Sequence, residues 1–257
     1  MKSVSVRFYE ELNDFLPQLK RKVRFTHEFF GQPSVKDLIE SLGVPHTEVD
    51  LIIVNQTSVS FSYLVKDGDD ISVYPEFESL DIARLQRLRP QTLRKPKFVL
   101  DVHLGTLARY MRMVGFDTKY ENTFSDEEII QLSLKEKRTI LTRDLGIFKN
   151  GKVTRGYFVR NTNPKKQIEE IIRRFDMKNK IKEFTRCIDC NSLLQKIDKK
   201  KIIDRLPPKV KSIYSQYYIC KECDKVYWQG SHYEKMKLLV DELKKPVLSG
   251  KAAMFIL

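Results

Sequence analysis

Two aspartates each end a short apolar run in the middle of the chain. Asp101 closes the run Phe-Val-Leu-Asp, and Asp144 closes the run Ile-Leu-Thr-Arg-Asp. Runs of this kind are typical of buried strands in a parallel sheet, and open α/β sheets bind ligands at the carboxyl ends of such strands. Two carboxylates at one sheet edge predict a site for a divalent metal ion, Mg²⁺ or Mn²⁺.

Two further acids can join this site. Asp126 and Glu127 follow Ser125, which is the predicted N-cap of a helix that begins at or near the same sheet edge. Clustered carboxylates that hold a metal ion can drive phosphodiester hydrolysis, because the metal activates water and stabilises the charge on the phosphate. The alternative is that Asp126 and Glu127 only complement the helix dipole, while Asp101 and Asp144 cap turns.

The elements that must position these acids alternate between strand and helix. Short apolar runs predict strands at residues 98–100, 118–120, 139–142 and 157–159, and apolar spacing predicts helices after Leu104, Ser125 and Pro164. This alternation predicts a parallel, three-layer α/β domain over residues 97–180.

Four cysteines predict a second metal site. They form two Cys-x-x-Cys pairs, Cys187 with Cys190 and Cys220 with Cys223, separated by 29 residues. Two such pairs supply four thiolates for a tetrahedral Zn²⁺, and a closed site of this kind is structural because it leaves no position for water. We therefore expect a zinc ribbon, with the C-terminal tail, over residues 181–257.

Basic and aromatic residues surround the second half of the ribbon. Lys199, Lys200 and Lys201 lie between the cysteine pairs, and Trp228 and His232 follow them. Cations that track the phosphate backbone and rings that stack on bases are typical of single-stranded RNA binding. The alternatives are that Trp228 belongs to a small core, that the lysines form a solvated face, and that His232 is structural.

Charge is divided unevenly along the chain. Residues 1–80 hold 8 Lys+Arg against 13 Asp+Glu, a net charge of −5. Since the whole chain carries +13, residues 81–257 carry +18. The steepest bias falls between Asp81 and Lys97, over a predicted basic linker of residues 80–96, which is either a solvated connection or an arm that contacts phosphate. No apolar run reaches the length of a membrane span, and the first residues lack a secretory signal, so we expect a soluble, cytoplasmic protein with no membrane partner.

Residues 1–79 predict a β-grasp domain. Strand patterns at residues 4–8, 23–25, 51–54, 59–63 and 71–74, with a helix from Ser34 to Gly43, give the order ββαβββ. The segment resembles the ubiquitin-like fold of small sulfur-carrier proteins, but residues 74–78 continue into the next segment where those carriers end in Gly-Gly. We expect a docking or regulatory module for a protein partner, or a cover for the basic surface, rather than sulfur transfer.

Five ordered motifs carry a resemblance that covers most of the chain. They are residues 98–101 (FVLD), 104–112 (LGTLARYMR), 115–118 (GFDT), 125–128 (SDEE) and 141–144 (LTRD). In spacing and residue type they resemble the Mut-seven C-terminal RNase-domain family, whose core is PIN-like and some of whose members carry an N-terminal ubiquitin-like segment. The resemblance implies a metal-dependent ribonuclease in which Asp101, Asp126 and Asp144 bind Mg²⁺ or Mn²⁺.

The chain departs from PIN-type nucleases in one respect. These enzymes commonly carry another acid just after the third metal-binding acid, which is Asp144 here. Residues 145–150 contain no carboxylate, so Glu127 or Asp117 is the candidate to replace it.

Three arginines lie beside the motifs. Arg109, Arg112 and Arg143 either bind RNA phosphate or pair with the acids, and we favour Arg143 for substrate. Two other functions stay open for the whole chain: a non-catalytic adaptor that binds single-stranded or structured RNA, and an interaction scaffold built on the ubiquitin-like segment.

Overall fold

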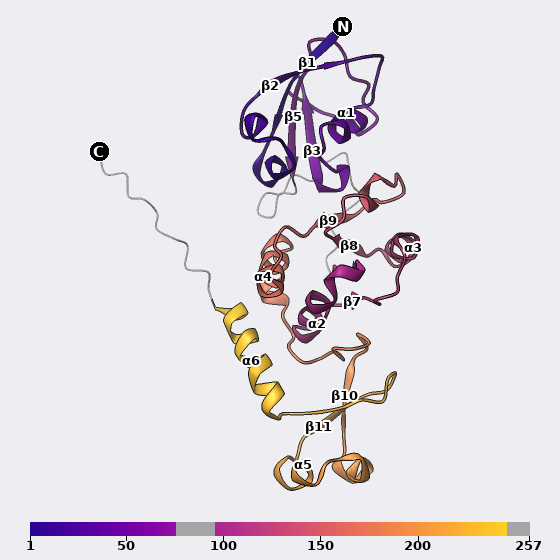
Figure 1. Ribbon diagram of the computed structural model, residues 1–257, viewed down its shortest axis with the longest axis vertical. Helices are drawn as coiled ribbons and strands as arrows, with labels where there is room; N and C mark the ends of the chain where they lie inside the picture. Colours follow the sequence, from indigo (N-terminus) through magenta and orange to yellow (C-terminus); the bar gives the residue numbers. More distant parts are fainter. Residues whose placement is uncertain (76–95, 246–257) are drawn as a thin grey trace, which may run out of the picture. The chain divides into compact units, whose positions relative to one another are not determined.

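The structure is a computed structural model of the chain that describes residues 1–75 and 96–245 (Figure 1). It divides into two compact units, one made of residues 1–105 and 120–162 and the other of residues 106–119 and 163–257. The predicted linker, apart from Pro96, and the C-terminal tail lie outside the described residues. Within those residues, no helix is both long and apolar enough to cross a bilayer.

The N-terminal part is a mixed five-stranded sheet with the order β2-β1-β5-β3-β4. Strand β1 pairs antiparallel with β2 and parallel with β5, and β5 pairs antiparallel with β3. These pairings match the predicted β-grasp. The elements are β1 (Lys2–Phe8), η1 (Glu10–Phe15), η2 (Gln18–Lys20), β2 (Phe25–Phe29), α1 (Val35–Ser41), η3 (His46–Glu48), β3 (Val49–Val54), β4 (Thr57–Ser58) and β5 (Asp70–Pro75).

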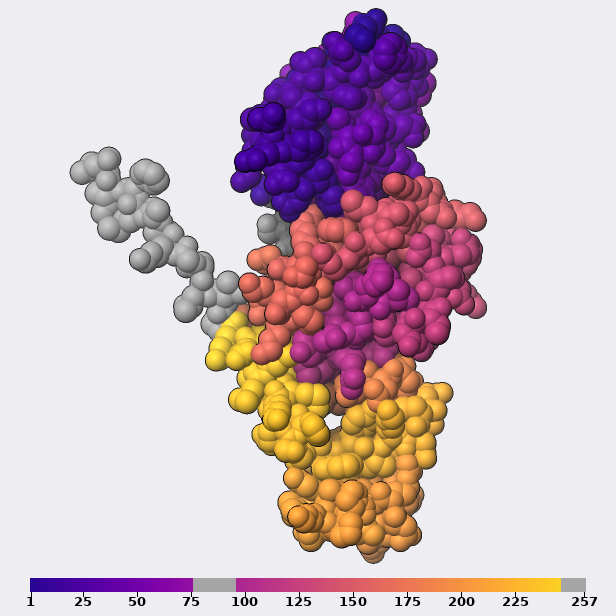
Figure 2. Space-filling view, in the orientation of Figure 1, coloured from indigo at the N-terminus to yellow at the C-terminus, as the bar shows by residue number. Residues whose placement is uncertain are grey.

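The core of this domain follows from strand and helix periodicity. Alternate residues of β1 are buried, and they pack with the apolar side of α1. Helix α1 begins as predicted, because Ser34 accepts from the Asp37 amide while the Asp37 carboxylate accepts from the Ser34 amide. In the space-filling view the domain is one closely packed body (Figure 2).

The strand predicted at residues 59–63 is wrong. The carbonyls of Phe61 and Tyr63 instead accept from the amides of Lys36 and Val35 in the first turn of α1. The apolar residues of this segment still pack on the core, so their alternation arises from burial beneath a turn rather than from a sheet. Likewise, β2 begins only at the end of the pattern predicted at residues 23–25.

The central part contains the predicted parallel strands. Strands β6 (Phe98–Leu100), β8 (Thr139–Thr142) and β9 (Gly156–Phe158) are neighbours in that order, and all are parallel. Helix α3 (Asp126–Glu136) packs against β6 and β8. Ser125 and Glu128 form the capping box that starts α3, as predicted. Other elements are η4 (Val102–Leu104), α2 (Gly105–Met113), β7 (Thr118–Lys119), η5 (Ile147–Lys149), α4 (Pro164–Arg174) and η6 (Lys178–Lys180).

The C-terminal part is a small antiparallel sheet of order β10-β11-β12. Ile202, Leu206 and Tyr217 form its buried core. With the sheets above, it gives the mixed α/β fold that the sequence predicts. Its elements are β10 (Leu194–Ile197), η7 (Lys199–Lys201), η8 (Ile203–Arg205), α5 (Pro208–Ile213), β11 (Tyr217–Cys220), β12 (Val226–Trp228) and α6 (Ser231–Lys244).

The substitution Gly156→Ala tests the packing of the parallel sheet. A Cβ at Gly156 would lie 2.2 Å from Cε1 of the Phe148 ring, which is buried. We expect Gly156→Ala to lower the free energy of unfolding by about 1–3 kcal/mol, measured by urea denaturation. The control is Gly151→Ala, where a Cβ meets nothing within 4 Å. Equal stability of the two variants would contradict the packing described.

Candidate functional site

Asp101 lies directly after β6, at the carboxyl edge of the parallel sheet. Its amide donates to the carbonyl of Leu141 at 3.0 Å, so the strand pairing fixes its position beside β8. Its side chain is 6% exposed, and Oδ2 accepts from the Thr142 hydroxyl at 2.8 Å. A buried carboxylate is thus held by the last residue of the neighbouring strand.

Asp144 lies two residues beyond the end of β8. Its amide donates to Thr142 Oγ1 at 2.8 Å, and its Oδ1 accepts from the Gly146 amide at 2.7 Å. The side chain of Asp144 is exposed. Since Oγ1 of Thr142 already accepts from the Asp144 amide, its own proton is available to the Asp101 carboxylate.

Thr142 is a site residue that the motif analysis did not single out. Its side chain is fully buried, and its one hydroxyl joins the backbone of Asp144 to the carboxylate of Asp101. The available signal was a hydroxyl residue at the end of a short, fully buried strand, directly before the Arg143-Asp144 pair. A buried hydroxyl in such a place needs partners, and the flanking acids supply them.

Asp126 is the first residue of α3, where Ser125 caps the helix. Although Asp126 is exposed, neighbouring atoms partly desolvate its carboxyl and raise its pKa, and the negative charges of Asp144 and Asp101 raise that pKa further. The structure therefore brings these three acids into one electrostatic field, with repulsion that a cation would relieve.

Glu127 is exposed and lies beside Asp126 in the same turn. Its Oε1 accepts from Gln131 Nε2 at 2.7 Å, one turn further along α3. Asp117 is the other candidate to replace the acid missing from residues 145–150. It contacts Arg186 and Asn191 in the second unit.

Arg143 organises the loop that follows β9. Its Nη1 donates to the carbonyls of Val159, Arg160 and Asn161 at 2.8, 2.7 and 2.9 Å. Its guanidinium also lies over the ring of Phe158, 5.9 Å from the centroid. The side chain is therefore committed to this loop through Nη1.

Arg112 has a structural position in the second unit. It is 3% exposed, Nε donates to Thr118 O at 2.9 Å, and Nη1 donates to the carbonyls of Ile188 and Asp189 at 3.2 and 2.5 Å. Arg112 thus fastens α2 to the first cysteine loop. Arg109 is exposed, and its guanidinium lies 3.8 Å from the carboxylate of Asp189.

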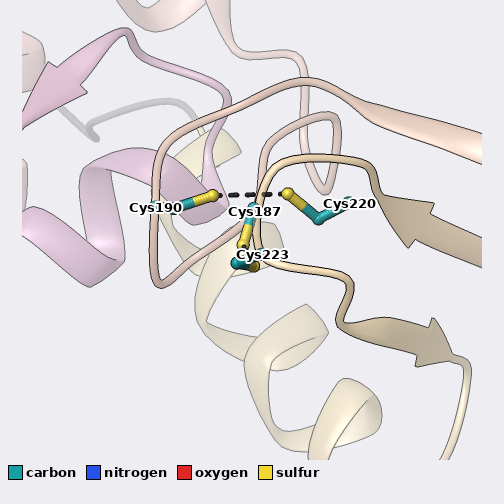
Figure 3. A group of neighbouring side chains, drawn as sticks. All are labelled: Cys187, Cys190, Cys220 and Cys223. Carbon is teal, nitrogen blue, oxygen red and sulfur yellow. Dashed lines mark hydrogen bonds between the residues drawn. The ribbon is translucent and has the colours of Figure 1, made fainter.

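The four cysteines converge on one point (Figure 3). Sulfur atoms of Cys187 and Cys223 lie 3.5 Å apart, and those of Cys190 and Cys220 lie 3.3 Å apart. Tetrahedral zinc, with Zn–S bonds of about 2.3 Å, places thiolates about 3.8 Å apart. Across the described parts of the chain, this is the one set of three or more acidic, cysteine or histidine residues whose ligand atoms all lie within 4.8 Å of one another. The three aspartates are therefore more widely spaced than the cysteines.

Neighbouring side chains fit a thiolate centre. The hydroxyl of Tyr227 lies 3.0 Å from the sulfur of Cys187. Burial and the nearby Cys187 raise the pKa of Tyr227, so its hydroxyl stays protonated and can donate to a thiolate. Lys225 forms an ion pair with Asp189 in the first cysteine loop.

The predicted RNA-binding residues of the ribbon differ in exposure. Nζ of Lys199 donates to the carbonyls of Lys211 and Tyr214, and half-buried Trp228 packs on the ribbon core. The remaining three are exposed to solvent: Lys200, Lys201 and His232.

Removing the bridging hydroxyl tests the geometry of the acids. Thr142→Val keeps the shape of the side chain but leaves Asp101 Oδ2 and the Asp144 amide without this partner. We expect the free energy of unfolding to fall by about 1–3 kcal/mol, measured by urea denaturation without divalent metal. Thr142→Ser keeps the hydroxyl and is the control, so an equal loss in both variants would contradict the role assigned to the hydroxyl.

Comparison with protein families gives two matches. The model described as the Mut7-C RNAse domain matches residues 96–240, and the model described as Mut7-C ubiquitin matches residues 1–81. Comparisons with curated proteins and with solved structures give no match. The first model covers more than half of the chain, which confirms the resemblance carried by the five motifs. The chain therefore belongs to the Mut7-C RNAse domain family and carries a Mut7-C ubiquitin domain at its N-terminal end.

Proposed function

We propose that the protein is a metal-dependent ribonuclease that hydrolyses RNA phosphodiester bonds. The observation that carries this proposal is that the charges of Asp101 and Asp144 act on Asp126. Desolvation and these two charges raise the pKa of the Asp126 carboxyl. Three acids from two strand ends and one helix start form an arrangement that favours a bound cation.

Each acid has a defined task in this proposal. Asp101 is held by Thr142 and supplies a fixed carboxylate, while exposed Asp126 and Asp144 can adjust to a metal and its water. Bound Mg²⁺ or Mn²⁺ would activate water and stabilise the charge that develops on the phosphate. Glu127, beside Asp126, is the candidate for a further ligand in place of the acid missing from residues 145–150.

Electrostatics supports RNA as the substrate. Residues 81–257 carry +18, and Arg109, Lys200 and Lys201 are exposed. We assign to them contacts with the phosphate backbone of single-stranded or structured RNA, whose affinity must then fall as salt rises. Arg143, next to Asp144, is the candidate for contact with the reacting phosphate.

The four cysteines are assigned to a structural Zn²⁺. Four thiolates close the coordination shell, so this metal has no position for water and takes no part in hydrolysis. Reduced cysteines also fit a cytoplasmic location.

A second candidate function is a non-catalytic RNA-binding adaptor. Two observations favour it: residues 145–150 lack a carboxylate, and the aspartates are spaced more widely than the ligands of the cysteine cluster. Such a protein would keep the salt-dependent affinity for RNA without turnover.

A cleavage assay separates these functions. Metal-stripped protein should cleave labelled single-stranded RNA only after Mg²⁺ or Mn²⁺ is added. We expect Asp101→Asn and Asp144→Asn to lower the rate by at least roughly 100-fold, because each removes a carboxylate that holds the metal. Glu121→Gln, which neutralises an exposed acid elsewhere, should cleave like the parent. Cleavage by both aspartate variants at the parental rate would rule out this site. If the parent and all variants bind RNA but none cleaves it, the result would support the adaptor.

Metal analysis tests the cysteine cluster. The purified protein should contain about one equivalent of zinc, and the double variant Cys187→Ser/Cys190→Ser should contain none, because two of four ligands are lost. Tyr227→Phe is a milder change that should keep the zinc but weaken its retention against a chelator by about 10–100-fold. Full zinc content in the double variant would overturn the assignment.

A further inference from the structure

A buried acid of the β-grasp domain binds the last strand of the parallel sheet. Glu48, at the end of η3, is fully buried, and its Oε1 accepts from the Phe158 amide at 2.5 Å. Phe158 ends β9, which pairs with β8 on its inner side. The carboxylate of Glu48 therefore satisfies an amide on the outer edge of β9, which is the last strand of this sheet among the described residues.

Arg160 completes this contact from the loop after β9. Its Nη2 lies 3.3 Å from Oε2 of Glu48, and its Nε lies 3.0 Å from the carboxylate of Asp14. Its guanidinium also stacks over the rings of Phe15 and Tyr157, at 5.2 and 5.0 Å from their centroids.

The charge of Arg160 is secured by its acidic partners. Burial opposes this charge, but Glu48, Tyr157 and Asp14 outweigh burial and raise the pKa of Arg160 above its ordinary value. The positive charge of Arg160 is therefore held beside the Glu48 carboxylate.

The same loop is held from its other side by Arg143. The carbonyls of Val159, Arg160 and Asn161 all accept from Nη1 of Arg143, and the Val159 amide donates to the Thr142 carbonyl at 2.8 Å. Arg143 directly precedes Asp144 in the sequence. Between Glu48 and Asp144 there is thus a continuous series of bonded groups.

We propose that Glu48 is a positioning residue for the candidate catalytic edge. By fixing the loop of residues 159–161, it holds Arg143 and so places Asp144. The β-grasp domain then acts as a fixed part of the site rather than as a detachable docking module. The placement of Asp144 stands on geometry alone, and its consequence for catalysis rests on the proposed ribonuclease function.

Amide hydrogen exchange on the full chain tests the placement. In Glu48→Gln, the amides of residues 157–161 and 142–146 should exchange roughly 10-fold faster, because the charge of the acid that holds the loop is gone. Residues 98–100 in the sheet centre should keep the parental rate. Asp14→Asn is the matched control, since it removes the exposed partner of Arg160 and leaves Glu48 in place, and residues 142–146 should not change.

A second variant tests whether Glu48 and Arg143 belong to the same series of bonds. Arg143→Lys removes the three-carbonyl contact without touching the β-grasp domain, and it should accelerate exchange in residues 142–146. Adding Glu48→Gln to Arg143→Lys should then add little at residues 142–146, because both changes interrupt the same series of bonds. Unchanged exchange there in Glu48→Gln, or an equal rise throughout the chain, would overturn the proposal, as would full additivity.

Metal affinity provides a readout that a general loss of stability would not move. If the parent binds Mn²⁺, measured by electron paramagnetic resonance, Glu48→Gln should bind it roughly 10-fold more weakly while Asp14→Asn binds it normally. Parental affinity in Glu48→Gln would count against the proposal. Absence of Mn²⁺ binding by the parent would instead contradict the proposed ribonuclease function, and the exchange experiment would still decide whether Glu48 positions residues 142–146.

Discussion

Repulsion among like charges is the constraint around which the central part of the molecule is built. Three acids, Asp101, Asp126 and Asp144, come from different segments of the chain. Their negative charges repel one another, so other interactions must hold them close. The parallel pairing of β6 with β8 aligns the strand ends, the capping box fixes the start of α3, and a buried hydroxyl joins two of the acids. Rigid elements thus hold a local arrangement of like charges that is electrostatically unfavourable by itself, a common relation between stability and function.

Local signals in the sequence were sufficient for most of the fold. The Ser125 and Ser34 capping boxes, the apolar runs before Asp101 and Asp144, and the cysteine spacing each depend on residues close together in the chain. Such short-range chemistry determines helix starts and strand ends directly. The false strand at residues 59–63 shows the limit, because burial beneath a turn produces the same alternation as a sheet.

The long-range partners of charged residues could not be predicted in this way. An arginine beside a catalytic motif has the same sequence signature whether it meets phosphate or a backbone carbonyl. Arg112 and Lys199 are examples, since both donate to carbonyls that only folding brings near. The same holds for Glu48, whose carboxylate meets Phe158 and Arg160 more than 100 residues away, and for Thr142, whose role depends on strand register.

The carboxylate of Glu48 at the outer edge of β9 also bears on how the chain avoids self-association. An outer strand with open amides is a template onto which a strand of another molecule can add, and such addition starts aggregation. In this fold the Glu48 side chain binds the Phe158 amide on that edge, so among the described residues an acid of the N-terminal domain, rather than another strand, occupies this amide. A chain shortened to residues 96–257 would lose this contact, and its solubility would then depend on the strand edge that Glu48 binds.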